Sequence, residues 1–158
     1  TSKNLVKEVI DFYSNPDNRY AVATQVGYFE IVNIKPFGDV VAKFDTGNSA
    51  SAPSIHADKI EIKGKKITWT YEDKTITSKL QRVAKVDVGG LNNYTEERYA
   101  ILLDIEFAGS LYKNVEFLLD DREDRSPILL NRKIMRQMNV MVNPQRKYIV
   151  TTKYVLDN

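Results

Sequence analysis

Residues 40–52 read VVAKFDTGNSASA, an apolar run that ends in Asp45-Thr46-Gly47 and opens into a segment of small residues. The run predicts a strand, and the residues after it predict a tight polar loop. A carboxylate can transfer protons, a threonine hydroxyl can brace the loop, and a glycine lets backbone and substrate approach closely. An aspartic peptidase needs this arrangement from each half of its active site. The tripeptide also occurs by chance, so its context decides the prediction.

The composition is that of one globular domain. The chain has 158 residues, of which 42% are hydrophobic and 28% charged, and its formal net charge is +2. Positive and negative residues interleave without a long basic tract, which argues against nucleic-acid binding. The absence of cysteine excludes disulfides and thiol nucleophiles and suits a reducing cytoplasm. The first residues are amphipathic and predict neither a signal peptide nor a membrane span. We therefore expect a cytoplasmic protein without a nucleic-acid or membrane partner.

The N-terminal segment predicts a short amphipathic helix. Its apolar stripe consists of Leu5, Val6, Val9, Ile10, Phe12 and Tyr13. Ser2 or Asn4 can cap the helix, and residues 15–18, which include a proline, are expected to end it. We therefore assign residues 1–18 to a helical extension and residues 19–158 to the main domain. We also expect the two ends of the chain to pack on the domain or on a partner.

From about Tyr20 onward, short β-branched and aromatic runs alternate with turn residues and predict strands. The predicted strands are 21–26, 28–34, 40–44, 59–62, 67–71, 75–80, 99–107, 112–119, 140–142 and 148–155. A polar loop is expected at 89–93, a solvated charged loop at 120–125, and a short helix at 132–138 after the apolar residues 128–130. Many short strands with few helices predict a mainly β fold that forms a small closed β-barrel.

The order of these features resembles the retropepsin-like aspartic peptidase fold. More closely, the chain is similar to a bacterial and phage family of proposed ATP-dependent zinc proteases, often encoded beside RimK-type ligases. Members read Lys-x-Asp-Thr-Gly-Ala and then Thr-Ser-Ala-Leu-His-Ala, which residues 43–48 and 51–57 echo with a small insertion. Further family segments correspond to residues 81–83, 96–99, 128–132 and 142–144. The resemblance covers roughly residues 25–150 and implies a β-barrel of acid-protease type with a short helix in the C-terminal region.

Two positions depart from the family pattern. Asn48 replaces a small alanine after the motif, and Asn131 replaces the glycine that lets the helix-entry turn pack against the catalytic loop. Asparagine tolerates left-handed backbone better than most residues, so the fold can accept the second change. Both changes bear on whether activity is retained.

The resemblance implies a catalytic loop and a substrate cleft. The catalytic residues are expected to be Asp45, Thr46 and Gly47, and the substrate-binding residues Asn48, Arg82, Glu97 and Arg98. Exposed ion pairing is an equally weighted interpretation of the last three. Trp69 and Tyr71 lie where a flap would be, although core packing is the simpler explanation for both.

The zinc and ATP in the family name find no support in these residues. Zinc sites take cysteine, histidine and carboxylate ligands, and the chain has one histidine, His56, and no cysteine. No phosphate-cradling glycine-rich loop with its lysine is present either. We therefore expect no metal and no cofactor, and interpret His56 as a structural residue beside the loop.

An aspartic peptidase needs two carboxylates, and the chain supplies Asp-Thr-Gly once. A homodimer that pairs two Asp45 side chains across a two-fold axis would supply both and would cleave a peptide or protein substrate. The rival hypothesis is a catalytically inert binding or assembly module of the same fold, for example one that contacts virion proteins in a phage particle. A basic barrel that binds nucleic acid is a third and weaker hypothesis.

Overall fold

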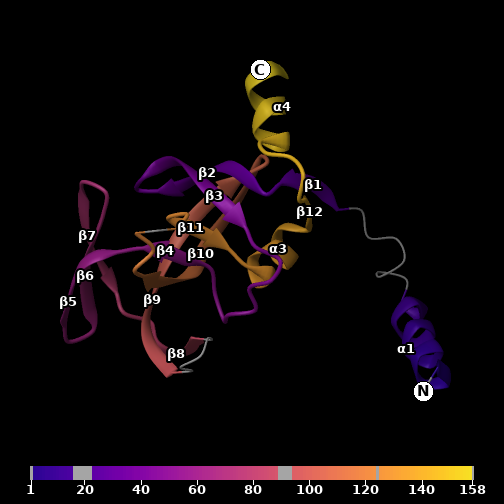
Figure 1. Cartoon of the computed structure of the whole chain (residues 1–158). Helices are drawn as coiled ribbons and strands as arrows, with labels where there is room; N and C mark the ends of the chain where they lie inside the picture. Colours follow the sequence, from indigo (N-terminus) through magenta and orange to yellow (C-terminus); the bar gives the residue numbers. More distant parts are fainter. Residues whose placement is uncertain (1, 16–22, 89–93, 124, 158) are drawn as a thin grey trace.

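The structure, a computed structural model, describes residues 2–15, 23–88, 94–123 and 125–157. Strands make up 55% of the chain and helices 19%, so the prediction of a mainly β fold is confirmed. The elements, labelled in Figure 1, are α1 (Ser2–Ser14), β1 (Thr24–Gly27), β2 (Phe29–Lys35), β3 (Gly38–Phe44), β4 (Ser54–His56), β5 (Asp58–Lys63), β6 (Lys66–Tyr71), β7 (Lys74–Lys79), β8 (Arg82–Val88), β9 (Tyr94–Phe107), β10 (Ser110–Asp120), β11 (Ile128–Leu130), α3 (Arg132–Met138), β12 (Val140–Asn143) and α4 (Ile149–Asp157). None of the described helices has the length and apolar character needed to cross a membrane.

Seven strands form one mixed sheet in the order β10-β4-β11-β3-β2-β9-β8, and β10 also pairs with β9. β2 and β3 form an antiparallel pair, as do β9 and β10. β11 lies between β3 and β4, parallel to β3 and antiparallel to β4. This placement brings residues 128–130 beside the end of β3, about 85 positions earlier in the chain, where the Asp45 loop begins.

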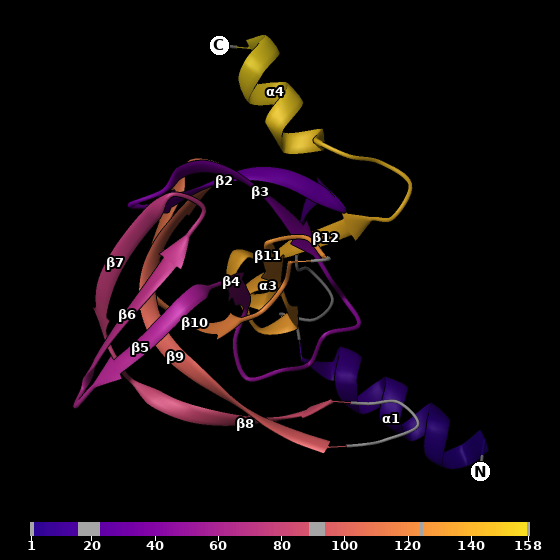
Figure 2. The same cartoon turned by 60° about the vertical axis from the view of Figure 1, so that its left-hand side comes forward.

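Two smaller sheets complete the fold. β5, β6 and β7 form an antiparallel sheet, which Figure 2 shows beside β9 at one side of the larger sheet. Trp69 and Tyr71 on β6 are buried and pack against Phe37, edge-to-face and tilted respectively, with ring centroids 5.5 and 4.8 Å apart, so the core interpretation of both is confirmed. β1 and β12 form a parallel two-stranded sheet.

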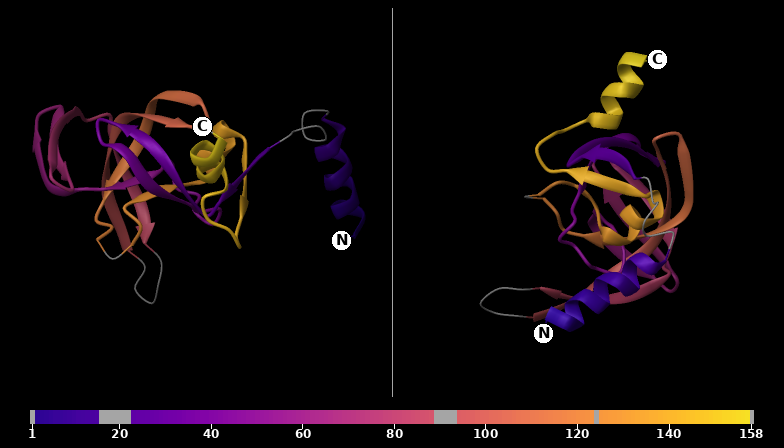
Figure 3. Two further views of the ribbon diagram at one scale, coloured as in Figure 1. Left: turned by 90° about the horizontal axis from the view of Figure 1, so that it is seen from above. Right: turned by 90° about the vertical axis from the view of Figure 1, so that its right-hand side faces the viewer.

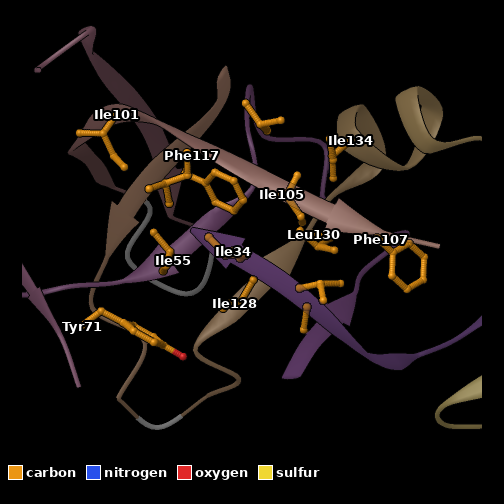
Figure 4. Close-up of a cluster of buried hydrophobic side chains, with 14 of the residues drawn as sticks. Ile34, Ile55, Tyr71, Ile101, Ile105, Phe107, Phe117, Ile128, Leu130 and Ile134 are labelled. Carbon is orange, nitrogen blue, oxygen red and sulfur yellow. The ribbon is translucent and has the colours of Figure 1, made fainter. Parts of the chain in front are cut away.

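The core lies between the strands and follows their alternation. On β9, Ile101, Leu103, Ile105 and Phe107 are buried at every second position. Figure 4 shows Ile101, Ile105 and Phe107 among core residues from other elements: Ile34 of β2, Phe117 of β10, Ile128 and Leu130 of β11, and Ile134 of α3. The period-two pattern of the sequence therefore determines which face of each strand points inward.

The C-terminal segment corrects one prediction. The sequence predicts a strand at residues 148–155, but α4 occupies this segment as a helix. The cause is Glu30 of β2, whose fully buried carboxylate accepts hydrogen bonds at the start of α4: from the Val150 N–H at 3.1 Å, the Thr151 N–H at 3.0 Å and the Thr151 hydroxyl at 2.8 Å. A carboxylate at a helix N-terminus satisfies free N–H groups and the helix dipole, which outweighs the local strand propensity.

Three of the described strands, β4, β8 and β11, are absent from the sequence prediction, which gave residues 128–130 of β11 only as an apolar run. β4 has only three residues and depends on pairing with β10 and β11, and β8 is a charged strand that pairs with β9.

Parts of other predictions lie outside the described residues: the helix-ending turn from residue 16, the assigned boundary after residue 18, the start of the strand at 21–26, the polar loop 89–93 and residue 124 of the charged loop.

The predicted N-terminal helix is confirmed as α1. Figure 3 shows α1 standing away from the strands, and no described helix or strand packs extensively against it. Its apolar stripe is at least half exposed, from 50% at Tyr13 to 63% at Leu5. Among the described residues, α1 therefore does not pack on the strands of the domain, which was one of the two alternatives expected for this end of the chain.

Candidate functional site

The Asp45 loop is held at the junction of two strands. Asp45 follows β3 directly, and its N–H donates to the Leu130 carbonyl of β11 at 2.9 Å. One carboxylate oxygen, Oδ1, accepts a hydrogen bond from the Gly47 N–H at 3.0 Å, whereas Oδ2 bonds to none of the described residues. Asp45 is partly buried, and Thr46 and Gly47 are exposed. The carboxylate is thus oriented by the backbone and keeps one oxygen available at a surface where another molecule can approach.

The loop is also bonded to the start of α3. Buried Asn131 caps this helix: its Oδ1 accepts from the Ile134 N–H at 3.5 Å, and its Nδ2 donates to the Ala50 carbonyl at 2.7 Å. The Arg132 N–H donates to the Asn48 carbonyl at 3.1 Å, and Asn48 Oδ1 accepts from the Ala50 N–H at 3.0 Å. Asn131 has φ −99° and ψ −176°, so its backbone is extended and needs no left-handed tolerance. Both asparagines that depart from the family pattern therefore form side-chain hydrogen bonds to the loop.

A hollow of about 440 Å³ opens beside the loop. Its lining includes Asn48 and Ala50 from the loop, Glu96 and Arg98 from β9, and Asp120 at the end of β10. Arg98 forms ion pairs with both Glu96 and Asp120. Strand alternation explains this grouping, because Glu96 and Arg98 are two residues apart on the same face of β9.

Asp120 is the centre of a buried charge network. It is 8% exposed and also faces Arg122 at 3.6 Å and Arg125 at 3.7 Å. Arg122 is 5% exposed and donates from Nε to the Ser126 carbonyl at 2.7 Å. The prediction of a solvated loop at 120–125 is therefore wrong for Asp120 and Arg122. A sequence signal could have indicated that Asp120 belongs to the site: it ends an apolar strand, much as Asp45 directly follows one.

The electrostatics connect this network to the loop. Burial lowers the pKa of the Arg122 guanidinium, and the positive charge of Arg125 lowers it further. The negative charges of Asp120 and Asp45 act in the opposite direction and raise it. The Asp45 carboxylate therefore acts electrostatically on this buried cation.

Three predicted substrate-binding residues occupy different surroundings. Arg98 lines the hollow, as described above. Arg82 donates a hydrogen bond to Ser51 Oγ at the far end of the loop at 2.7 Å, and it forms an ion pair with Glu116 of β10, whose Oε1 accepts from its Nε at 2.8 Å. Glu97 is exposed and alternates to the other face of β9, so it is absent from the lining of the hollow. The neighbouring Glu96, which the sequence did not single out, takes the position in the hollow.

His56 is a satisfied structural residue. Its Nδ1 accepts from the Arg122 N–H at 2.8 Å, and its Nε2 lies 3.1 Å from Asp58 Oδ1. The side chain is 12% exposed. Within the described part of the chain, no three or more histidine or acidic side chains gather as a metal site. Because both nitrogens of the single histidine are engaged, these residues do not fit the zinc that the family name implies.

Comparison with known proteins gives a structural neighbour. No family model and no curated protein matches the chain. A crystal structure of a protein of unknown function (DUF785) from Legionella pneumophila is similar with a TM-score of 0.64 and 24% sequence identity, covering 81% of this chain and 98% of that chain. The two proteins therefore share their fold, and nearly all of the Legionella protein corresponds to part of this chain.

Proposed function

We propose that this protein is a retropepsin-like aspartic endopeptidase whose two catalytic carboxylates are Asp45 from each copy of a homodimer. The observation that carries the proposal is the oriented Asp45 carboxylate with a free oxygen, in a loop whose next residues, Thr46 and Gly47, are exposed. A chain with one such loop needs a second copy to supply the second carboxylate. The cysteine-free composition suits the cytoplasm as the expected location.

The strand pairing supports an acid-protease type of barrel. The pairings run from β10 through β4, β11, β3 and β2 to β9, and β9 also pairs with β10. The pairings therefore close on themselves, as a closed barrel requires, and β8 extends the sheet from β9. β11 and α3 follow one another beside the Asp45 loop. This is the order in which the family resemblance places the Asp-Thr-Gly strand, the Leu-Leu turn and the helix.

The chemistry follows from placing two like charges together. At about 3 Å and an effective dielectric of about 20, two ionised carboxylates repel by roughly 5 to 6 kcal/mol, or about 4 pK units. The pair therefore shares one proton. The ionised Asp45 accepts a proton from the water that attacks the peptide carbonyl, and the protonated Asp45 donates a hydrogen bond to the developing oxyanion. Thr46 braces the two loops, and the hollow beside Asn48 and Arg98 receives part of the peptide.

The test is Asp45→Asn, which keeps the size of the side chain but cannot take or share the proton. We expect the variant to remain folded and to lose cleavage of a peptide library, read by mass spectrometry across acidic to neutral pH. The matched control is Asp39→Asn, an exposed aspartate on β3, the strand that leads into Asp45. Wild-type cleavage should follow a bell-shaped pH profile and should resist chelators. Cleavage that persists in Asp45→Asn, or that zinc restores after chelation, contradicts the mechanism.

The paired charges of the hollow favour a second candidate function, an inert binding or assembly module of the same fold. Glu96 and Asp120 are already paired with Arg98 and Arg122, so the formal charges of these four groups sum to zero, as expected of a structural network. In this case wild-type protein cleaves nothing at any pH, and Asp45→Asn leaves binding to protein partners, including virion proteins, unchanged.

A further inference from the structure

The apolar face of α1 is largely exposed among the residues that the structure describes. Leu5, Val6, Val9 and Ile10 are between 57% and 63% exposed, and the described strands and helices leave this face open. An isolated helix of 13 residues is only marginally stable in water. A helix with this stripe therefore needs another surface to cover it.

We propose that α1 is a dimerisation arm, whose apolar face packs on a second copy of this chain at the interface that joins the two Asp45 loops. The inference rests on the proposed function, which needs two copies, and it names the segment that holds them together.

The entry point of the N-terminal segment supports this location. β1 follows α1 in the chain, and the Thr24 N–H at its start donates to the Asn139 carbonyl at 3.0 Å. Asn139 and Val140 line a hollow of about 360 Å³ together with Thr46 of the catalytic loop. β1 thus begins beside the loop. A two-fold axis through two such loops brings both N-terminal segments to one interface.

The area available fits a dimer. At the exposures found, the six apolar side chains of the stripe present on the order of 500 Å² of apolar surface per copy. A standard interface buries roughly 800 Å² per partner. The exposed Thr46 loop and Met141 of β12, which is 57% exposed, supply further surface near the same entry point.

The polar face of α1 argues against a lipid surface. Helices that lie on anionic membranes carry an excess of lysine and arginine on this face. In α1 the charged residues are Lys3, Lys7, Glu8 and Asp11, which sum to zero, and Lys7 bonds to Asp11 at 2.6 Å. A neutral polar face is suited to a protein partner with an apolar surface.

The experiment compares three full-length proteins by sedimentation equilibrium over a wide range of concentration. The double variant Val6→Asp with Ile10→Asp places two negative charges on the apolar face. The control Lys7→Asp changes the net charge by the same amount on the polar face. We expect the double variant to raise the dimer dissociation constant at least 100-fold and the control to change it less than threefold. Circular dichroism and thermal unfolding verify that the strands remain folded.

A second measurement keeps this inference separate from the proposed function. The chain has no cysteine, so Thr46→Cys reports by disulfide formation whether two Asp45 loops meet, with Asp73→Cys at the β6–β7 turn as the control. If the wild-type protein is a dimer and the double variant dimerises equally well, the role of α1 as a dimerisation arm is overturned. Disulfide crosslinking of the Thr46→Cys variant would in that case still support the paired Asp45 site. If dimerisation depends on α1 but the Thr46→Cys variant does not crosslink, α1 is still an interface between two copies. The paired Asp45 site, and the placement of α1 at that site, are then overturned. A wild-type monomer at all concentrations overturns both.

Discussion

The strongest test of the fold concerns Glu30, the buried carboxylate that anchors α4. We predict that Glu30→Gln destabilises the protein by about 3 kcal/mol, a large part of the roughly 5–15 kcal/mol that holds a typical domain folded. Glu30 is fully buried and accepts four hydrogen bonds, from the N–H groups of Gly27, Val150 and Thr151 and from the Thr151 hydroxyl. No cation pairs with this carboxylate among the described residues, so hydrogen bonds and the α4 dipole stabilise its charge.

The magnitude follows from what a glutamine can still do. If its amide oxygen keeps the bonds to Gly27 and Val150, its NH₂ group faces Thr151. The Thr151 hydroxyl can accept from that group, but the Thr151 N–H is left without an acceptor. A buried donor without a partner costs about 1–3 kcal/mol. The loss of charge at the helix N-terminus adds about 1 kcal/mol, and the two remaining bonds weaken because they are no longer charge-assisted.

Urea unfolding followed by the fluorescence of the single, buried Trp69 measures this loss. With a slope of about 2 kcal/mol per molar, the midpoint should fall by about 1.5 M. Exposed Glu106→Gln is the matched control and should change stability by less than about 0.5 kcal/mol. Amide exchange at Val150 and Thr151 shows whether α4 detaches before the sheet unfolds. A loss below about 1 kcal/mol, with unchanged exchange at these amides, would refute the assignment of Glu30 as the anchor.

Two further predictions concern the loop and the core. Asn131→Ala removes a helix cap and the bond to the Ala50 carbonyl, so we expect urea unfolding to show a loss of about 2 kcal/mol; an unchanged midpoint would contradict the bracing role. Burial raises the pKa of Tyr71 above its ordinary value of 10.0, and Glu72 raises it further. The unfolded chain therefore releases this proton first, so the stabilisation is complete below about pH 10 and is lost as pH rises through the folded-state pKa. Tyr71→Phe should reduce this alkaline loss in unfolding experiments from about pH 9 to about pH 11, and equal losses in both proteins would contradict the prediction.

The sequence predicted the elements whose signals are local. The strand into Asp45, the hairpin of β9 and β10 and the helix α3 follow from alternation, turn residues and helical spacing within a few positions. The same reasoning predicted that Asp45 lies in a polar loop at the end of a strand. It selected Glu97, whereas Glu96 lines the hollow, because the two occupy opposite faces of one strand and only the position of the hollow decides between them.

The apolar face of α1, the alternation of the strands and the composition of the Asp45 loop are therefore properties of the sequence by itself. Tertiary structure alone decided that residues 149–157 form a helix, since their β-branched residues favour a strand until Glu30 binds the first N–H groups. It also decided that Asp120 and Arg122 are buried, because their charges are tolerated inside only where partners from distant segments meet them. The physical reason is the same in each case: propensity and periodicity act between neighbours along the chain, whereas burial and charge pairing depend on residues that only folding brings together.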